Sequence, residues 1–392
     1  MPGRSPFRRQ TVDVIFLMVA AGGAVLVAAT HLVIGWLISN GLHRGALAVS
    51  PRAKDLGVRV REVTRSRIVL EAPTARRDIG HPGTLGLSWE GGYGRLGDVI
   101  DVDDRRFIRS FEPVTGSPPV CVAALEDCPP VEIDSFTFPN DPSDVDLEFR
   151  TTTYESPLGP IGAWLVPGDG SDLWAVHCHG WTAERRELLR MLPSYHAAGL
   201  TSLVIDYRND PGAPLDPTGR HRFGLSEWED LEAAVQEALD EGASGVVLSG
   251  CSTGGALVMA FLERSRLAEV VTAVVLDSPN IVLAEAFRWG TRDLRATRLM
   301  VELGMWIADL RWKIDWEATN FVDRADHIIR VPTLVFHGTS DQVIPIAVSR
   351  RLAARLPDLV ELVETPAAGH VMSWNADPER YDRNLRGFLR RV

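Results

Sequence analysis

The hydrophobic pattern divides the chain into three stretches of different character. An almost unbroken apolar run covers residues 14–38, and its 25 residues exceed the roughly 20 that an α-helix needs to cross a bilayer core. From 58 to about 110, short apolar segments alternate with Gly, Pro and Asp turns, which is typical of β-strands; the expected strands are 58–63, 67–72, 84–89 and 106–111. From 147 to 392, strand-like and helix-like segments alternate, and this rhythm predicts a parallel sheet covered by helices on both faces.

Short apolar runs mark the expected strands of this last stretch, and helix-periodic segments separate them. The strands are 147–154, 162–166, 173–177, 202–206, 245–248, 273–276, 333–336 and 360–363. The helices are 184–198, 227–241, 255–265, 347–356 and 379–390. Because ligands of open α/β sheets bind outside the carboxyl ends of the strands, a site is expected in the loops that follow these strands.

The apolar run at 14–38 is expected to be an uncleaved membrane anchor that follows a basic N-terminus, residues 1–13. A cleaved signal peptide is the alternative, because Ala28-Ala29 could precede a cleavage site. The run continues beyond that point to Ile38, which a cleaved segment would not need. Trp36 near its end also suits a membrane interface.

The orientation of this anchor depends on its flanking charges. Arginines 4, 8 and 9 precede the apolar run, and Arg44, Arg52 and Lys54 follow it. The short, charged N-terminus favours the cytoplasmic side for itself, because cytoplasmic flanks retain positive charge. We therefore expect a single-pass membrane protein whose bulk, including residues 147–392, lies outside the cytoplasm.

Between the anchor and the last stretch, residues 39–57 are expected to be a linker. Residues 58–145 are expected to be a small β-rich region with a Pro- and Asp-rich connector. No catalytic pattern stands out there, and the lone His81 is interpreted as a surface or turn residue. Cys121 and Cys128 would form a local disulfide if this segment lies outside the cytoplasm; two unpaired thiols are the alternative.

Composition argues against several classes of function. The net charge is −11 and no basic stripe is interleaved with aromatic residues, so nucleic-acid binding is not expected. Cys178 and Cys251 are interpreted as buried packing residues, and no Cys/His spacing suggests zinc. His177 and His179 alternate on one strand, but no third ligand lies nearby. The sequence therefore predicts neither a metal nor a cofactor.

The tight turn at 250–254 carries the clearest chemical pattern of the chain. Its sequence, Gly-Cys-Ser-Thr-Gly, fits the G-x-S-x-G nucleophile elbow, between an apolar strand and a helix-periodic segment. A serine on such a strand-to-helix turn presents its hydroxyl above the sheet, and the flanking glycines avoid collisions. Ser252 is therefore the expected nucleophile.

Two further groups follow in the chain order that a Ser-Asp-His triad needs. Asp341 comes just after the strand 333–336, and His370 lies between the last strand and the last helix. His370 could accept the serine proton through one ring nitrogen while the other donates to Asp341. The alternatives are a helix-capping aspartate and a surface histidine, and Asp277 is the second candidate for the acid.

The oxyanion hole is expected in the loop after the strand 173–177. There Gly180 lets the backbone turn, and the backbone N–H groups of Trp181 and Thr253 are the expected donors. The polar run 207–210, Tyr-Arg-Asn-Asp, follows the next strand and is interpreted mainly as a set of structural hydrogen bonds.

Together these motifs resemble the α/β-hydrolase superfamily, in particular its esterase and serine-aminopeptidase-like branch. The resemblance covers residues 147–392 and rests on His179-Gly180-Trp181, the elbow at 250–254, the run from His337-Gly338 to Asp341, and Gly369-His370. It implies an α/β-hydrolase fold, with a mostly parallel sheet and a helical cap insert, and a Ser-His-Asp triad. Members of this branch often carry residues other than Cys251 and Thr253 in the elbow, so no subfamily is assigned.

In this superfamily, an insert at the position of 280–330 is a helical cap that covers the site. Here it must bury its apolar side chains against the core, a ligand or a membrane. Core packing is the simplest interpretation, and a hydrophobic acyl pocket is the functional hypothesis. The apolar residues are Phe287, Trp289, Leu299, Met300, Leu303, Met305, Trp306, Ile307, Leu310, Trp312 and Trp316.

The expected function is that of a membrane-anchored serine hydrolase that cleaves a small-molecule or lipid-like carboxylic ester through an acyl-enzyme intermediate. One alternative is a peptidase or amidase with the same triad, although no acidic pair in the cap offers a handle for a peptide amine. The other is a non-catalytic protein of this fold that binds a partner through its β-rich region. A complete triad favours an enzyme over a scaffold.

Overall fold

The computed structural model describes residues 6–49, 57–72, 77–121 and 127–392. The chain forms two compact units. The first consists of Met1–Ala48 and Gly290–Trp316, and the second of Val49–Trp289 and Glu317–Val392. The first unit is helical, whereas the second contains one sheet of six strands and one of eight.

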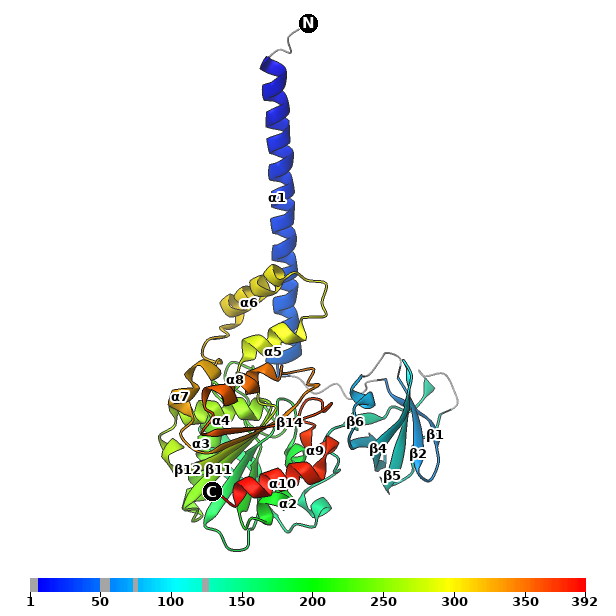
Figure 1. Ribbon diagram of the computed structural model, residues 1–392, viewed down its shortest axis with the longest axis vertical. Helices are drawn as coiled ribbons and strands as arrows, with labels where there is room; N and C mark the ends of the chain where they lie inside the picture. Colours follow the sequence, from blue (N-terminus) through cyan, green and yellow to red (C-terminus); the bar gives the residue numbers. More distant parts are fainter. Residues whose placement is uncertain (1–5, 50–56, 73–76, 122–126) are drawn as a thin grey trace. The chain divides into compact units, whose positions relative to one another are not determined.

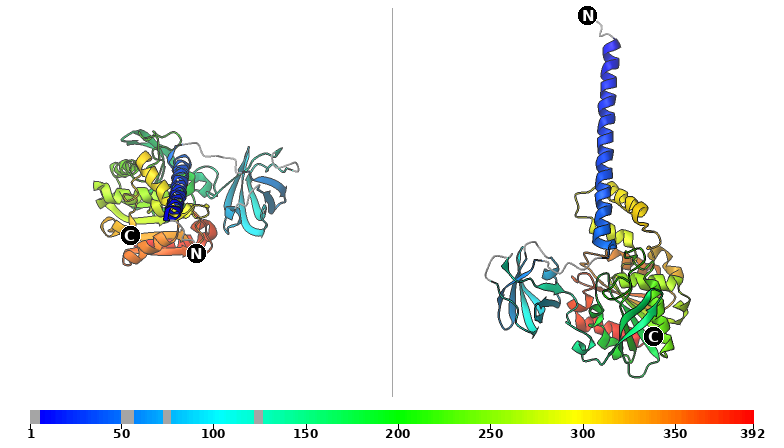
Figure 2. Two further views of the ribbon diagram at one scale, coloured as in Figure 1. Left: turned by 90° about the horizontal axis from the view of Figure 1, so that it is seen from above. Right: turned by 180° about the vertical axis from the view of Figure 1, so that it is seen from behind.

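In the first unit, α1 (Pro6–Leu42) and α6 (Arg298–Trp312) lie side by side (Figures 1 and 2). α1 extends beyond both ends of the apolar run that predicted it, and a π-helical turn, His43–Leu47, follows. The stretch Ala20–Leu47 is long and apolar enough to cross a membrane, and only 6% of its apolar 18-residue window is buried. A signal sequence would also meet this criterion of length and composition.

The larger sheet of the second unit has the strand order β14-β13-β12-β11-β9-β10-β8-β7. The six strands from β9 to β14 pair in parallel, and β8 and β7 add an antiparallel edge. All eight predicted strands are present; β9 to β13 are buried apolar runs, whereas β7, at the edge, is largely polar and exposed. They are β7 (Arg150–Ser156), β8 (Gly159–Val166), β9 (Leu173–Cys178), β10 (Thr201–Ile205), β11 (Gly245–Cys251), β12 (Val271–Asp277), β13 (Thr333–Gly338) and β14 (Val360–Thr365).

Helices cover both faces of this sheet, with α3 and α4 on one face and α2 and α10 on the other (Figure 1). Four of the five predicted helices are present, and the insert at 280–330 is helical as expected. The helices that follow the prediction are α3 (Trp228–Asp240), α4 (Thr253–Arg264), α8 (Ala347–Arg355) and α10 (Pro378–Leu389). The insert adds α5 (Leu283–Gly290) and α7 (Ala325–Ile328), and α9 (Ser373–Ala376) precedes α10.

The prediction of one continuous helix over 184–198 is wrong. A 3-10 turn, Arg185–Leu188, and a one-turn helix, α2 (Leu192–His196), replace it. The physical reason is that two charged side chains of this stretch point into the protein. Glu187 and Arg190 are buried and hydrogen-bond to Gly180 and Val371, so the stretch does not present the single apolar face of an amphipathic helix.

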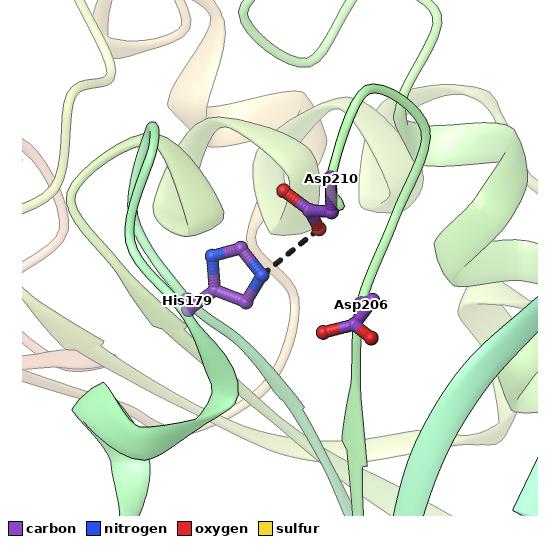
Figure 3. A group of neighbouring side chains, drawn as sticks. All are labelled: His179, Asp206 and Asp210. Atoms are coloured by element: carbon purple, nitrogen blue, oxygen red, sulfur yellow. Dashed lines mark hydrogen bonds and ion pairs between the residues drawn. The ribbon is translucent and has the colours of Figure 1, made fainter. Parts of the chain in front are cut away.

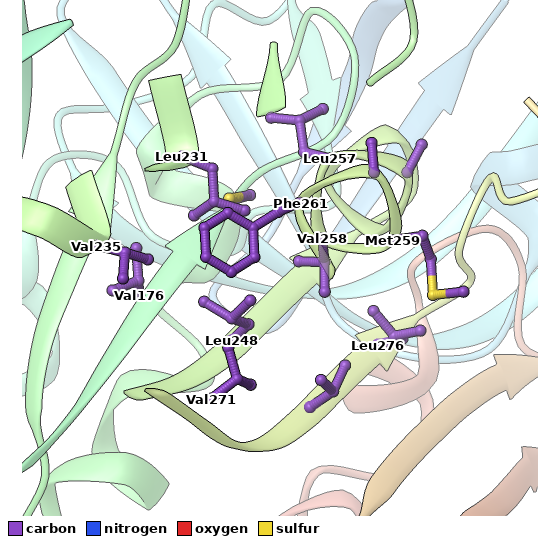
Figure 4. Close-up of a cluster of buried hydrophobic side chains, with 14 of the residues drawn as sticks. Val176, Leu231, Val235, Leu248, Leu257, Val258, Met259, Phe261, Val271 and Leu276 are labelled. Atoms are coloured by element: carbon purple, nitrogen blue, oxygen red, sulfur yellow. The ribbon is translucent and has the colours of Figure 1, made fainter. Parts of the chain in front are cut away.

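The core on the α3–α4 face fixes the position of the turn at Ser252. Figure 4 shows Val258 and Phe261 of α4 among fully buried side chains of neighbouring strands, including Leu248 and Leu276. α4 is buried along its whole first part, from Thr253 to Phe261. A helix packed in this way cannot shift without disturbing many contacts, so its N-terminus is a rigid support for the turn before it.

The smaller sheet is antiparallel, with the order β1-β2-β5-β4-β3-β6. The prediction found β1 (Arg59–Val63), β2 (Arg67–Glu71), β3 (Leu85–Trp89) and β5 (Arg106–Thr115). It missed β4 (Gly92–Val102), whose glycines and aspartates are typical of turns, and the short β6 (Glu132–Asp134). The glycines have a packing reason: a Cβ on Gly94 would lie 2.4 Å from the Phe111 ring. Cys121 and Cys128 form a disulfide.

Candidate active site

Ser252 occupies the turn between β11 and α4 in a backbone conformation that residues other than glycine rarely adopt, with φ 50° and ψ −114°. Three backbone hydrogen bonds hold it there. The Ser252 N–H donates to Asp277 O at 2.9 Å, and Ser252 O accepts from the N–H groups of Gly255 at 3.0 Å and Asn280 at 2.8 Å. The strained turn is therefore anchored to both the helix and the neighbouring strand.

The two glycines of the elbow allow backbone segments to approach closely. A Cβ on Gly250 would lie 2.5 Å from Gly254 O, and a Cβ on Gly254 would lie 2.3 Å from Cys178 O. Neither separation is possible for real atoms, and backbone cannot swing away as a flexible side chain does. The structure thus explains both glycines of the G-x-S-x-G pattern by contact with backbone.

The structure brings Ser252, His370 and Asp341 into one hydrogen-bonded chain. His370 Nε2 lies 2.9 Å from Ser252 Oγ, and His370 Nδ1 lies 2.7 Å from Asp341 Oδ2. The three side chains come from the loops after β11, β14 and β13, all at the carboxyl edge of the sheet. Ser252 and Asp341 are buried, whereas 21% of the His370 side chain is exposed, so the middle of the chain of hydrogen bonds is open to solvent.

Asp341 is held in place by the turn in which it lies. Its Oδ1 accepts hydrogen bonds from the N–H groups of Val343 at 2.7 Å and Ile344 at 2.8 Å. Burial by itself would raise the pKa of Asp341, but His370 and His337 beside it outweigh burial and hold the pKa well below the usual range. At neutral pH, Asp341 is therefore an anion beside His370.

Asp277, the second candidate for the acid, does not contact His370 in the described part of the chain. Its Oδ1 accepts from Ser278 Oγ at 3.0 Å, and no partner among the described residues reaches its Oδ2. Burial raises the pKa of Asp277 to about 6, against the opposing effect of Arg190. The geometry therefore favours Asp341 over Asp277 as the partner of the histidine.

The turn after β9 passes directly beside Ser252. A Cβ on Gly180 would lie 3.2 Å from Ser252 Cβ. The turn is fixed from both sides, since the Gly180 N–H donates to Glu187 Oε2 at 2.7 Å and Gly180 O accepts from the Tyr207 hydroxyl at 3.1 Å. Among the described residues, the next backbone N–H, of Trp181, has no hydrogen-bond partner, and neither has that of Thr253. Both predicted oxyanion donors are thus free to bind an anion.

A charged cluster supports this turn from behind (Figure 3). His179 Nε2 lies 3.0 Å from Asp210 Oδ2, and His179 Nδ1 lies 2.8 Å from Gly180 O. Burial by itself lowers the pKa of His179, but the Asp210 carboxylate outweighs burial and raises it to about 9. His179 is therefore a cation at neutral pH, and both ring nitrogens donate hydrogen bonds.

The same cluster has the residue types of a metal site, because ligand atoms of His179, Asp206 and Asp210 lie within 4.8 Å of one another. A histidine binds a metal through an unprotonated ring nitrogen, and both nitrogens of His179 are engaged as donors. Asp206 is paired with Arg185 at 3.0 Å. These partners fit an ion-pair network that fixes the turn at Gly180, and they do not fit a metal centre.

The chain matches the model of a known protein family. The model of the alpha/beta hydrolase family matches residues 175–383, just over half of the chain and the part that carries Ser252, Asp341 and His370. The chain belongs to the alpha/beta hydrolase family. The resemblance inferred from the motifs is thereby confirmed, as is the fold class.

Matches to individual proteins add only an uncharacterized relative and a likeness of fold. An uncharacterized protein of Mycobacterium tuberculosis, found in strains CDC 1551 and H37Rv, is 28% identical over 228 residues, which are 57% of this chain and 70% of that protein. Two crystal forms of the Pyrococcus furiosus esterase Pf2001 align with TM-scores of 0.51 and 0.52 at 21% and 20% identity. Each alignment covers 65% of this chain, and they cover 96% and 94% of the esterase. At this identity the likeness shows the fold alone.

The loop that carries His370 in the hydrolase domain is itself strained. Ala367 and Val371, on either side of the histidine, have φ values of 59° and 51°, which a β-branched residue such as valine avoids. Two side chains hold Val371 in this conformation. Val371 O accepts from Arg190 Nη2 at 2.9 Å, and the Val371 N–H donates to Ser278 Oγ at 3.1 Å. Arg190 is almost fully buried.

The β-rich region completes the support of this loop through Asn375. The Asn375 amide donates to Thr84 O at 2.6 Å and Ser135 O at 2.9 Å, and its oxygen accepts from Arg190 at 2.9 Å. The contact is close, because a Cβ on Gly83 would lie 2.5 Å from Asn375 O. Ala368 and Met372, near the histidine, share one buried cluster with the smaller sheet, formed around Ile79, Leu85 and Phe107.

A first prediction concerns His179. Its folded pKa of about 9 lies above the unfolded value of about 6.5, so its contribution to stability is complete below about pH 6.5 and is lost as the pH rises through about 9. We expect the free energy of unfolding of the wild type to fall by up to about 3 kcal/mol more than that of His179→Gln over this range. Urea unfolding of the full chain in detergent, at several pH values, measures the difference.

The control is His327→Gln, which changes an exposed histidine of α7. Its pH dependence should follow the wild type. Equal slopes for wild type and His179→Gln would show that His179 is not held as a cation.

A second prediction concerns Asn375. Asn375→Ala removes the side-chain hydrogen bonds that join the β-rich region and Arg190 to the His370 loop. Displacement of catalytic groups by about 1 Å can cost a hundredfold in rate. We expect kcat on a soluble test substrate to fall about tenfold to a hundredfold with little change in KM, at a temperature where the variant remains folded. Asn384→Ala removes a local bond within α10, to Arg380 O, and should leave kcat unchanged. Equal kcat in both variants would contradict a positioning role.

Proposed function

We propose that this alpha/beta hydrolase is a serine hydrolase that cleaves carboxylic esters and is held at a membrane by α1. The observation that supports this most directly is the unbroken chain of hydrogen bonds from Ser252 Oγ through His370 to Asp341. It has the order and the distances that a nucleophile, a general base and an orienting acid need. The esterase fold of the Pyrococcus protein is consistent with this reaction class.

The proposed reaction has two halves. Ser252 Oγ attacks the acyl carbon while His370 Nε2 accepts its proton, and the carbonyl oxygen becomes an oxyanion between the N–H groups of Trp181 and Thr253. His370 then gives the proton to the departing alcohol, which leaves an acyl group on Ser252. Water, deprotonated by His370, attacks the acyl carbon, and the released serine recovers its proton. No metal or cofactor is required for these steps.

Three features support membrane attachment with the hydrolase domain outside the cytoplasm. α1 contains an exposed apolar stretch long enough to span a bilayer. The disulfide between Cys121 and Cys128 belongs to oxidising compartments rather than to the cytoplasm of most organisms. The basic residues before the apolar stretch fit a cytoplasmic N-terminus.

A third prediction tests the nucleophile. A fluorophosphonate probe should label the full-length wild-type protein, because an activated serine attacks phosphorus as it attacks an acyl carbon. Ser252→Ala and His370→Ala should remain unlabelled, since one lacks the nucleophile and the other the base. Gel fluorescence after incubation with the probe measures labelling.

Ser171→Ala is the matched control, because Ser171 lies just before β9, at the amino end of that strand, and should label as the wild type does. A folded wild-type protein that stays unlabelled would contradict the proposal. If labelling succeeds, a panel of matched ester and amide substrates decides between an esterase and an amidase with the same triad.

A fourth prediction concerns pH. Burial by itself would lower the pKa of His370, but the Asp341 carboxylate outweighs burial and raises it above its ordinary value. Because a general base acts in its neutral form, the labelling rate should rise with pH around a midpoint above about 6.5. In Asp341→Asn the anion is lost, so the midpoint should move to lower pH and the maximal rate should fall, by about 10⁴-fold in a comparable triad. An unchanged midpoint would show that Asp341 does not control His370.

A further inference from the structure

The exposed face of α6 is unusually apolar for a helix in water. Leu299, Trp306 and Leu310 recur at spacings of seven and four residues, which places them on one stripe of the helix. The exposed fractions are 64% for Leu299, 56% for Trp306 and 52% for Leu310. The opposite face, around Gly304 and Ala308, is buried. α6 is thus apolar on two opposite faces, and only one of them is covered by protein.

α6 packs against α1 at a point where both helices carry glycine. A Cβ on Gly304 would lie 2.6 Å from Ile38 Cγ2, and a Cβ on Gly35 would lie 3.0 Å from Leu303 Cγ. Such a close approach at small residues is typical of helix pairs in membranes, where packing rather than exclusion of water holds helices together.

The register of the two helices sets the depth of α6 along α1. Beyond the crossing at Gly304, Arg311 lies over the Trp36 ring at 5.7 Å and donates to Asn40 at 2.8 Å, and Trp312 stacks on His43 at 3.9 Å. The two helices therefore run in the same direction. Residues of α6 that precede Gly304 lie beside the part of α1 that precedes Ile38, within the apolar run.

We propose that the exposed stripe of α6 lies in the lipid bilayer beside α1. This inference rests on the proposed membrane anchor and extends it to a second, interfacial helix. The stripe continues the exposed apolar surface of α1, where Val33 and Leu37 are 58% and 54% exposed, so the lipid that surrounds α1 also covers α6. Three tryptophans and an arginine where the apolar run ends fit the interface of a bilayer: Trp36, Trp306, Trp312 and Arg311.

For the proposed hydrolase, this arrangement points to esters that reside in the bilayer. In the sequence, α6 lies between β12, which leads to Ser278 beside the His370 loop, and β13, which leads to Asp341. Both strands that border the site are thus joined through the chain to a helix in lipid. Lipid-like esters reach such an enzyme from the membrane, whereas short, soluble esters reach it from water.

The experiment uses the full chain with a single introduced cysteine, reconstituted into vesicles of phosphatidylcholine and phosphatidylglycerol. Trp306→Cys and Asp309→Cys receive an environment-sensitive fluorophore; Asp309 is exposed on the polar flank of the same helix. Labelling is selective, because Cys178 and Cys251 are buried and the other two cysteines form the disulfide. Quenching by a spin-labelled lipid is compared with quenching by aqueous iodide.

We expect the label at position 306 to be quenched at least about twofold more by the lipid quencher than the label at 309, and the reverse with iodide. Leu310→Cys repeats the measurement within the stripe in case the tryptophan is needed for folding. Val25→Cys reports on α1 alone. If the label at 25 is quenched by lipid while those at 306 and 310 are quenched by iodide, the anchor stands and the inference is overturned. If none of the three labels is quenched by lipid, the membrane anchor and the inference about α6 are both contradicted.

A second measurement separates the inference from the proposed chemistry. Trp306→Glu and Leu310→Glu place a charge in the stripe. Both variants should keep fluorophosphonate labelling and hydrolysis of a soluble acetate ester, and should lose at least about tenfold in hydrolysis of a long-chain ester held in the vesicles. Unchanged hydrolysis of the vesicle-held ester would overturn the assignment of bilayer substrates. A folded wild-type protein that is not labelled by fluorophosphonate would instead contradict the proposal of a serine hydrolase.

Discussion

The close approach of backbone to backbone at Gly250 and Gly254 is the constraint on which the site depends. At Gly254 it lets the start of α4 lie against the end of β9, so that the turn at Gly180, which continues β9, passes beside Ser252. A side chain at Gly254 would force α4 away from β9, and a side chain at Gly250 would force α4 away from β11. The nucleophile and the turn that carries Trp181 are therefore positioned by one contact, and each of them is held further by its own hydrogen bonds.

The histidine is positioned in a different way. Its loop has two residues with positive φ, and it relies on groups from distant parts of the sequence to remain in that conformation. Arg190 contributes from the segment after β9, and the β-rich region contributes through Asn375. A sheet that precedes the hydrolase domain in the sequence thus acts as part of the support for the last loop of that domain.

The central strands of the hydrolase domain, β9 to β13, could be predicted because each is a continuous buried run. The three residues of the hydrogen-bonded chain could be proposed because chain order and strand ends restrict the choice. The supporting residues were missed. Arg190 lies inside the range 184–198, which the pattern predicts as one helix; an arginine between Leu189 and Met191 is a usable signal of a buried partner. Asn375 has no local pattern, since its partners Thr84 O and Ser135 O are more than 200 residues away in the sequence. Glu187 binds the Gly180 N–H only seven residues away, but across a turn that the pattern of apolar positions does not predict.

The pairing of α1 with α6 has a consequence for how the protein is made. α1 ends at Leu42 and α6 begins at Arg298, with both sheets' first strands encoded between them. At a synthesis rate of about 5–20 residues per second, α6 follows α1 by about 13–50 s. During that interval the glycine surface around Gly35 has no partner, so the earliest helix of the chain is among the last to complete its packing. The two-helix unit can therefore assemble only after translation has passed well into the hydrolase domain.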